Sequence, residues 1–258
     1  MNDYKQIKLA YTTNVDFYTG NIYEYDMKGA FIVFTKNFCS DILSEDELIH
    51  LNDISPNKRQ RNIYIGILQR KHKRVLAERL NDLLRYFLHR FIVENKINET
   101  DIMSIKKDAL FVKKRCDVLV FDSTVTFVEK NNYNYFVKYR TDSNKELELY
   151  TNEKGYSLKG AQNISKQNTQ LFKVLKTTLV KFNELSLSEF IVFSRKLLQR
   201  LDKSDPMFLS SESVVVLSSG FELAYGKIKN TKYEKEISYS VFVNEYFVPL
   251  VNKLIKRG

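Results

Sequence analysis

The sequence contains few of the residues that build metal clusters and disulfide frameworks. Only two cysteines occur, Cys39 and Cys116, and they lie far apart in the chain. The three histidines, His50, His72 and His89, do not cluster with them. Zinc sites and small disulfide-bonded domains need closely spaced ligands or paired cysteines, so we expect neither. The low cysteine content favours a reducing, intracellular compartment.

Long apolar runs are also missing. No apolar stretch reaches the roughly 18 residues that a transmembrane helix requires, so we expect no membrane partner. Residues 1–6 lack the basic-then-apolar pattern of a secretory signal. The chain has no internal repeat and no low-complexity tract. These absences favour an intracellular, cytoplasmic globular protein, whose 258 residues can form one large or two smaller domains.

Positive charge is what the chain has in excess. The formal net charge is +10 and the isoelectric point is near 9.3. Basic residues gather in runs at residues 58–61, 70–74 and 113–115. An even solubility charge would explain the total, whereas local runs favour a polyanionic partner, because phosphate contacts supply much of the affinity for nucleic acid.

The N-terminal part predicts strands and then a short helix. Residues 7–36 alternate aromatic and β-branched residues with turn residues, and one of the predicted strands ends at Asp26. A lone aspartate at such a position is also typical of a turn or a helix cap. Residues 44–51 predict an acidic helix, in which Ser44 and Glu47 have capping-box spacing.

Two further segments have a helical pattern. Residues 27–34 form an apolar segment after a turn and fit either a strand or a helix. In residues 58–97, leucine and phenylalanine recur every three or four residues, which predicts amphipathic helices. The opposite face is basic, which fits either a solvated helix face or a helix that faces phosphates.

Residues 102–140 return to a strand pattern. Residues 101–112 predict two short strands joined by a turn that carries Asp108 at its tip. Such a turn is either a solvated hairpin or a place where a carboxylate holds a divalent cation. Turn signals at residues 122–123 and 131–132 divide the remaining strands.

The C-terminal part predicts helices. Residues 141–165 form a polar loop region, and residues 166–202 carry apolar positions at helical spacing. Residues 234–256 end in an amphipathic helix whose last turn is basic.

The order of these features is that of a polymerase palm interrupted by fingers. The chain resembles the family B DNA polymerases, whose first acidic motif is D-x-x-S-L-Y-P. The corresponding residues here keep Asp26 and the aromatic Phe31, with Gly29 in place of serine and Ile32 in place of proline. The resemblance covers roughly residues 20–165.

The fingers motif of that family, K-x-x-x-N-S-x-Y-G, resembles residues 58–66. Lys58, Asn62 and Gly66 keep the spacing, and Ile65 replaces the tyrosine. By this resemblance, Lys58 neutralises the triphosphate of the nucleotide, while Asn62 and Gly66 let the helix approach it.

The second acidic motif, Y-G-D-T-D-S, resembles residues 104–112, which keep Asp108 and the following apolar strand. Lys106 replaces the first acid, and a cation there would compete with a metal for the same space. The resemblance implies that Asp26 and Asp108 are catalytic and hold Mg²⁺ or Mn²⁺ for two-metal phosphoryl transfer. Phe31 would stack below the sugar.

Two further segments extend the resemblance. Lys130 and Tyr133 partly match the K-K-x-Y segment, and Lys159 and Gly160 match the Lys-Gly pair that contacts the primer–template backbone. These four residues are therefore expected to bind nucleic acid.

The resemblance implies an α+β fold with a palm-like antiparallel sheet, a helical fingers insertion and a mainly helical, thumb-like C-terminal region. The expected ranges are 1–57 and 100–145 for the palm, 58–99 for the fingers and 146–258 for the thumb.

Two functions follow from this resemblance. The first is template-directed DNA polymerisation, by a small polymerase or by the palm and fingers subunit of a split one, in the DNA replication of a virus or mobile element. Its partners would be primer–template DNA, deoxynucleoside triphosphates and other polymerase subunits. The second is a catalytically impaired polymerase-like protein that binds nucleic acid or supports assembly.

Overall fold

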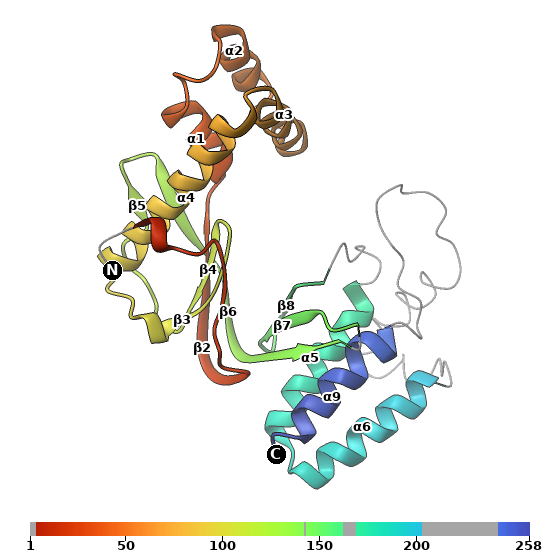
Figure 1. Ribbon diagram of the computed structural model, residues 1–258. Coiled ribbons are helices and arrows are strands. Elements are labelled where there is room, and N and C mark those ends of the chain that lie inside the picture. The colour runs from red at the N-terminus through yellow and green to blue at the C-terminus, as the bar shows by residue number, and fades with distance from the viewer. Residues whose placement is uncertain (1–3, 142, 162–168, 203–241) are drawn as a thin grey trace. The chain divides into compact units, whose positions relative to one another are not determined.

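The computed structural model describes four stretches of the chain, residues 4–141, 143–161, 169–202 and 242–258 (Figure 1). The chain divides into two compact units. Unit 1 comprises residues 1–14 and 21–132, and unit 2 comprises residues 15–20 and 133–258. No helix in the described part is long and apolar enough to cross a membrane.

The strands form an antiparallel arrangement in the order β1-β3-β4-β2-β6-β7-β8, with β5 pairing with β6. Their bounds are β1 Ala10–Thr12, β2 Phe17–Met27, β3 Ile102–Lys106, β4 Ala109–Val112, β5 Val120–Phe121, β6 Val125–Arg140, β7 Glu146–Thr151 and β8 Tyr156–Lys159. The units divide within β2 and within β6, so each of these strands contributes residues to both units.

The described residues of unit 1 form four α-helices and two short 3₁₀ helices. They are η1 Tyr4–Gln6, α1 Ala30–Phe38, α2 Glu45–Asp53, α3 Lys58–Lys71, α4 Lys73–Glu94 and η2 Glu99–Asp101. The expected capping box begins α2, where the Ser44 backbone N–H donates to Glu47 Oε2 at 2.9 Å. The Glu47 carboxylate also forms ion pairs with Lys71 and His72, the residues at which α3 ends. One carboxylate therefore links α2 to the α3–α4 junction.

The core of unit 1 forms between α4 and the sheet. The apolar stripe predicted for this helix is buried, and Phe87 and Phe91 are fully enclosed. The Phe87 ring stacks on Phe34 of α1 at 5.4 Å, and the Phe91 ring lies 4.3 Å from Phe127 of β6. Burying large aromatic rings against the strands fixes α4 on the sheet, and with it the strand ends on which the candidate site is built.

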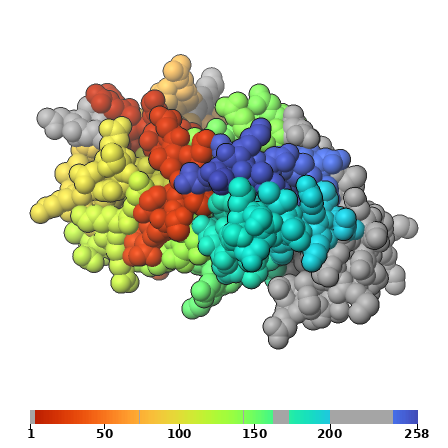
Figure 2. Space-filling view, turned by 90° about the horizontal axis from the view of Figure 1, so that it is seen from below, coloured from red at the N-terminus to blue at the C-terminus, as the bar shows by residue number. Residues whose placement is uncertain are grey.

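Unit 2 packs helices on the other strands. The helices are α5 Thr169–Glu184, α6 Leu187–Asp202, the π-helix η5 Val243–Phe247 and α9 Val248–Ile255. Figure 2 shows α9 (blue) beside α6 (cyan) on the surface of this unit. Buried side chains of β6 and β7, among them Val137 and Leu149, pack with Leu179, Phe190 and Leu250 of the helices.

Residues 30–38, which the sequence allowed as a strand or a helix, form α1, because Gly29 adopts the left-handed conformation with φ of 62° and turns the chain out of β2. One expectation about local structure is wrong. Residues 131–132 do not form a turn but continue β6, and the Asn131 amide donates to Glu24 Oε2 at 2.8 Å.

The polar region at 141–165, for which the sequence predicts a loop, also contains strands. Strands β7 and β8 pair there, and most of β7 is buried. A glutamate inside it, Glu148, is 4% exposed and accepts a hydrogen bond from the Tyr150 hydroxyl at 2.9 Å. Part of the predicted C-terminal helix, residues 234–241, lies outside the described residues.

The molecule is therefore a mixed helix and strand protein with antiparallel pairing, which confirms the expected α+β class in this coarser form. The ranges assigned to palm, fingers and thumb remain predictions.

Candidate active site

The two candidate catalytic acids lie at the ends of neighbouring strands in unit 1. Asp26 is the penultimate residue of β2, and its register partner on β4 is Ala109. Asp108 directly precedes Ala109 in the turn between β3 and β4, and its carbonyl accepts the Met27 N–H at 3.0 Å. Lys107 before it has φ of 58°, the positive value that a two-residue hairpin turn requires. The tight turn therefore holds Asp108 beside Asp26.

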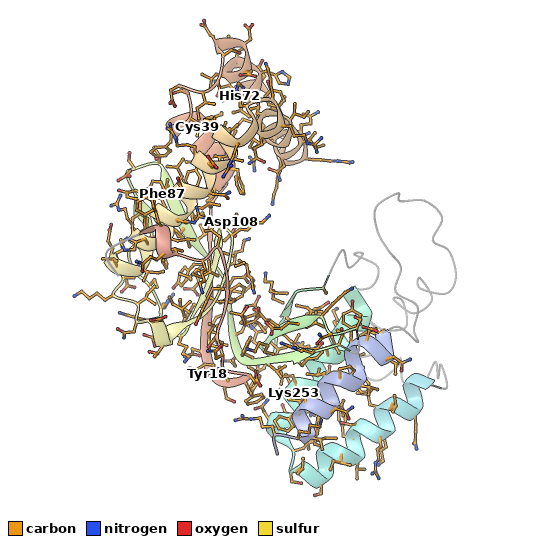
Figure 3. The ribbon with its side chains drawn as sticks, viewed as in Figure 1. Tyr18, Cys39, His72, Phe87, Asp108 and Lys253 are labelled. Carbon is orange, nitrogen blue, oxygen red and sulfur yellow. The ribbon has the colours of Figure 1, made fainter. Side chains whose placement is uncertain are left out.

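A third strand brings a cation to this pair. Lys130 of β6 places its Nζ 2.7 Å from Asp26 Oδ2, and the Asp26 side chain is 18% exposed. Glu24 lies two residues before Asp26 and so on the same face of β2. We call Glu24, Asp26, Asp108 and Lys130 the carboxylate site. Figure 3 labels Asp108 at the end of the unit 1 sheet from which the helices rise.

The electrostatics of the carboxylate site show an excess of negative charge. Burial raises the pKa of Asp108, and the neighbouring charge of Asp26 raises it further, against the opposing effect of Lys130 and Lys107. Burial lowers the pKa of Lys130, but the hydrogen bond to Asp26 and the charges of Asp26, Glu24 and Asp108 outweigh it and raise that pKa. Two lysines, Lys130 and Lys107, thus act on three carboxylates, and the remaining negative charge favours an additional cation.

The donor set fits a magnesium or manganese ion that is completed by substrate. Within the described residues, no group of three or more His, Cys, Asp or Glu side chains could hold a metal by itself. Mg²⁺ needs only one or two carboxylates when substrate phosphates and water fill the other positions. Asp26 and Asp108 provide two carboxylates of this kind.

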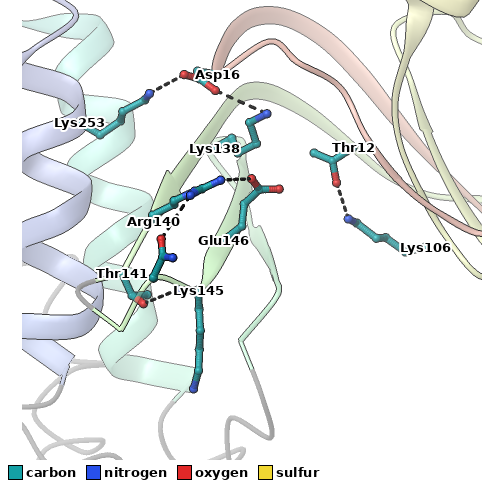
Figure 4. Close-up of polar contacts among 10 residues, drawn as sticks. Thr12, Asp16, Lys106, Lys138, Arg140, Thr141, Lys145, Glu146 and Lys253 are labelled. Carbon is teal, nitrogen blue, oxygen red and sulfur yellow. Dashed lines mark hydrogen bonds and ion pairs between the residues drawn. The ribbon is translucent and has the colours of Figure 1, made fainter.

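The cation that pairs with Asp26 is Lys130, for which the sequence predicted only a contact with nucleic acid. Lys106 directs its ammonium to β1, where Nζ donates to Thr12 Oγ1 at 2.8 Å (Figure 4). The charges that act on Asp108 include those of Lys130 and Lys107. The expected competition between Lys106 and a metal stays a prediction, while the ion pair that the structure places on Asp26 is made by Lys130.

The residues expected to bind the nucleotide lie on the helices of unit 1. Lys58, Asn62 and Gly66 follow one another at four-residue intervals in α3, which puts them on one helix face. Lys58 and Asn62 are exposed, and a Cβ at Gly66 would meet no atom within 4 Å. Phe31 lies in the first turn of α1, half-buried against the core. Their predicted roles remain predictions.

The residues expected to hold the primer–template backbone lie partly in unit 2. Tyr133 is 2% exposed, and its ring lies 5.8 Å from that of Tyr150, so it is a core side chain. Lys159 ends β8 opposite Glu148. Gly160 has φ of 88°, and a Cβ there would lie 2.3 Å from the Glu146 carbonyl oxygen. The structure thus gives Tyr133 and Gly160 packing roles, and their contact with DNA remains a prediction.

Sequence reasoning missed Glu24 and the pairing of Lys130 with Asp26. The first had a signal, because strand alternation puts Glu24 on the same face as Asp26. The ion pair between Lys130 and Asp26 had no such signal, because the sheet brings together two residues that are far apart in the sequence.

Comparisons with known proteins come from a family model and from solved structures. The model of the bacteriophage PBS1 gene 130 protein matches residues 2–203. The chain belongs to this family. None of the curated proteins searched matches the sequence.

Among solved structures, the family B DNA polymerase from the hyperthermophilic archaeon Pyrobaculum calidifontis is similar, with a TM-score of 0.45 and 11% sequence identity. The match covers 93% of this phage-family chain and 45% of the polymerase chain, so the chain spans less than half of that protein's length. A likeness at this level carries no argument about function, which has to come from the site itself.

Proposed function

We propose that this member of the phage family is a template-directed DNA polymerase, or the palm and fingers subunit of a split one. The observation that carries the proposal is the placement of Asp26 and Asp108 at adjacent strand ends, with an unbalanced negative charge. Phosphoryl transfer requires little covalent chemistry from the protein. It depends on positioning the substrates and on stabilising the charge of the transition state.

Each part of the site has a defined task in this proposal. Asp26 and Asp108 would hold Mg²⁺ or Mn²⁺, which supplies positive charge for the attacking and leaving oxygens. Lys58 and Asn62, exposed on one face of α3, would bind and orient the triphosphate. Gly66 fits the same face, because a glycine with open space around it leaves room for close approach of a ligand.

A second function is favoured by one observation, the ion pair between Lys130 and Asp26. If the ammonium group permanently replaces the metal, the protein is a catalytically impaired nucleic-acid-binding or assembly subunit. The two functions make opposite predictions about catalysis by the wild-type chain.

Primer extension on a primed DNA template, with Mg²⁺ or Mn²⁺ and with or without candidate partner subunits, separates them. The polymerase proposal expects metal-dependent incorporation that Asp26→Asn abolishes, since this change removes a ligand charge and keeps the side-chain shape. Asp117→Asn is the matched control, because Asp117 is an exposed carboxylate of unit 1 outside the site. Incorporation that survives Asp26→Asn would refute the assigned site, and inactive wild type under all conditions would favour the second function.

A further inference from the structure

A second charged site lies in unit 2 and has no place in the proposed reaction. A pocket of about 490 Å³ opens between the second half of β6, the start of β7 and α9. All its lining residues belong to unit 2: Asp16, Lys138, Tyr139, Arg140, Glu146, Pro249, Asn252, Lys253 and Lys256. We call it the basic pocket. Its volume lies in the range of small-molecule sites, about 300–1,000 Å³.

The charge of the basic pocket is positive. Four of its lining residues are basic and two are acidic. A neighbouring hollow of about 350 Å³ shares Asp16, Lys253 and Lys256 with it and adds Arg257, whose guanidinium lies 4.3 Å from the centre of the Phe17 ring. Lys253 lies in the last turn of α9, and Lys256 and Arg257 follow directly after that helix.

The two acids balance only part of this charge. The Asp16 carboxylate forms ion pairs with Lys253, whose Nζ lies 2.5 Å away, and with Lys138, whose Nζ lies 3.5 Å away (Figure 4). Arg140 reaches Glu146 only at 4.0 Å, and its side chain is 66% exposed. Lys256 is exposed. The pocket therefore keeps cationic side chains at its surface that a bound anion would contact.

The kinds of donor favour phosphate among anions. Arginine offers a planar fork that pairs with two oxygens of a phosphate, while lysine supplies a point charge. Ammonium groups and a guanidinium are all donors, which suits a ligand whose oxygens are all acceptors.

We propose that the basic pocket of unit 2 is a phosphate-binding site, which takes either a phosphate of a nucleic-acid strand or a free diphosphate. The proposal does not depend on polymerase activity, because none of its residues belongs to the carboxylate site.

The test measures binding to the full-length protein in EDTA, so that divalent cations do not recruit phosphate to the carboxylate site. Calorimetry with inorganic pyrophosphate examines the free anion, and fluorescence anisotropy with a short labelled oligodeoxynucleotide examines the strand. An oligoglutamate peptide is the control ligand, because it carries negative charge without phosphate.

Four variants make the result specific. Arg140→Gln and Lys256→Gln should each weaken binding about fivefold to tenfold, the loss expected for one charge-assisted hydrogen bond. Glu146→Gln should strengthen binding about twofold to threefold, because it removes a competing negative charge beside Arg140. Lys145→Gln is the matched control, since Lys145 belongs to the same unit but does not line the pocket.

The two binding measurements also identify the source of the phosphate. Saturable pyrophosphate binding that follows the variant pattern assigns a free diphosphate, and the same pattern with the oligonucleotide alone assigns a nucleic-acid backbone. The proposal is overturned if Lys145→Gln weakens binding as much as the pocket variants, if Glu146→Gln weakens it, or if the peptide shows the same pattern. Thermal unfolding of each variant verifies that the exposed substitutions leave the fold intact.

Discussion

The carboxylate site of unit 1 and the basic pocket of unit 2 are built from the same kind of contact with opposite results. Each pairs an aspartate on or beside β2 with a lysine, Asp26 with Lys130 and Asp16 with Lys253. In unit 1 the pKa of a neighbouring carboxyl group, that of Asp108, is raised. In unit 2 hydrogen bonding and charge from Lys253 and Lys138 lower the pKa of Asp16, against the effect of burial.

The difference teaches that an ion pair alone does not identify the ligand of a site. What decides is the charge left over after the pairs have formed. The carboxylate site has three acids against Lys130 and the neighbouring Lys107, so it favours a cation. The basic pocket has more basic than acidic side chains, so it favours an anion. The two sites therefore predict opposite responses to the same substitution.

The largest expected effect comes from replacing one aspartate in each unit. Asp108→Asn should lower nucleotide incorporation by at least about a thousandfold, because it removes a metal ligand from a site with few others. Asp16→Asn should leave incorporation within about twofold, since it only releases Lys138 and Lys253, which lie outside the carboxylate site. Single-turnover primer extension measures both. A comparable loss in the two variants would contradict the division into a catalytic and an anion-binding site.

Replacing one glycine in each unit should change the free energy of unfolding in opposite directions. Gly160→Ala should destabilise the protein by about 2–3 kcal/mol, because the residue has positive φ and a Cβ would collide with the Glu146 carbonyl. Gly66→Ala should stabilise it by up to about 1 kcal/mol, since it replaces an interior helix glycine with open space around it. Denaturant unfolding measures both changes.

The Gly66→Ala variant also tests the proposed contact between α3 and the nucleotide. If α3 receives the nucleotide, Gly66→Ala should raise the KM for nucleotide while the fold becomes more stable. Gln69→Ala, on the same helix, is the control for a general effect of helix stabilisation. Unchanged nucleotide kinetics in Gly66→Ala would remove Gly66 from the site.

Local patterns predicted α2, α3 and α4 of unit 1 correctly. The Ser44–Glu47 capping box and the apolar stripe of α4 are determined by residues within two turns of one another, so the sequence contains their whole cause. The pairing of Asp26 and Asp108 was also predictable in outline, because each acid stands at the end of a period-two strand pattern.

The features that the sequence did not predict depend on contacts between residues far apart in the chain. The twin asparagines at residues 131–132 are typical of a turn, yet Asn131 bonds Glu24 across the sheet and β6 continues through them. Strand β7 carries glutamates that predict a solvated loop, yet Glu148 is buried with its own hydrogen-bond donor. The ion pair between Lys130 and Asp26 was missed for the same reason, because the two residues are far apart in the sequence.

Removing that ammonium should have a smaller effect than removing a carboxylate, and of the opposite sign. Lys130→Met should tighten Mn²⁺ binding about tenfold, because the cation that competes for Asp26 is gone. Lys138→Met, the corresponding change at Asp16, should leave Mn²⁺ binding unchanged. Calorimetric titration of Mn²⁺ measures both, and weaker binding in Lys130→Met would mean that the lysine supports the metal site.

The smallest expected effect is the response of folding stability to pH. The folded pKa of Asp16 lies below its ordinary value of 3.8, so its stabilising contribution is present above that value and is lost as the pH falls through the lowered pKa. Because the side chain is half exposed, the contribution is only about 0.5–1 kcal/mol. Asp16→Asn should therefore lower the unfolding midpoint by about 1–4 °C at neutral pH.

Asp108 should behave in the opposite way. Its folded pKa lies above 3.8, so its contribution is present below that value and is lost as the pH rises through the raised pKa. At neutral pH, Asp108→Asn removes a charge that repels Asp26, and the unfolding midpoint should stay unchanged or rise. Thermal unfolding of both variants between about pH 3 and pH 7 measures the two trends. A lower midpoint for Asp108→Asn at neutral pH would mean that the ionised carboxylate stabilises the turn, and that the negative charge of the site is already balanced without a metal.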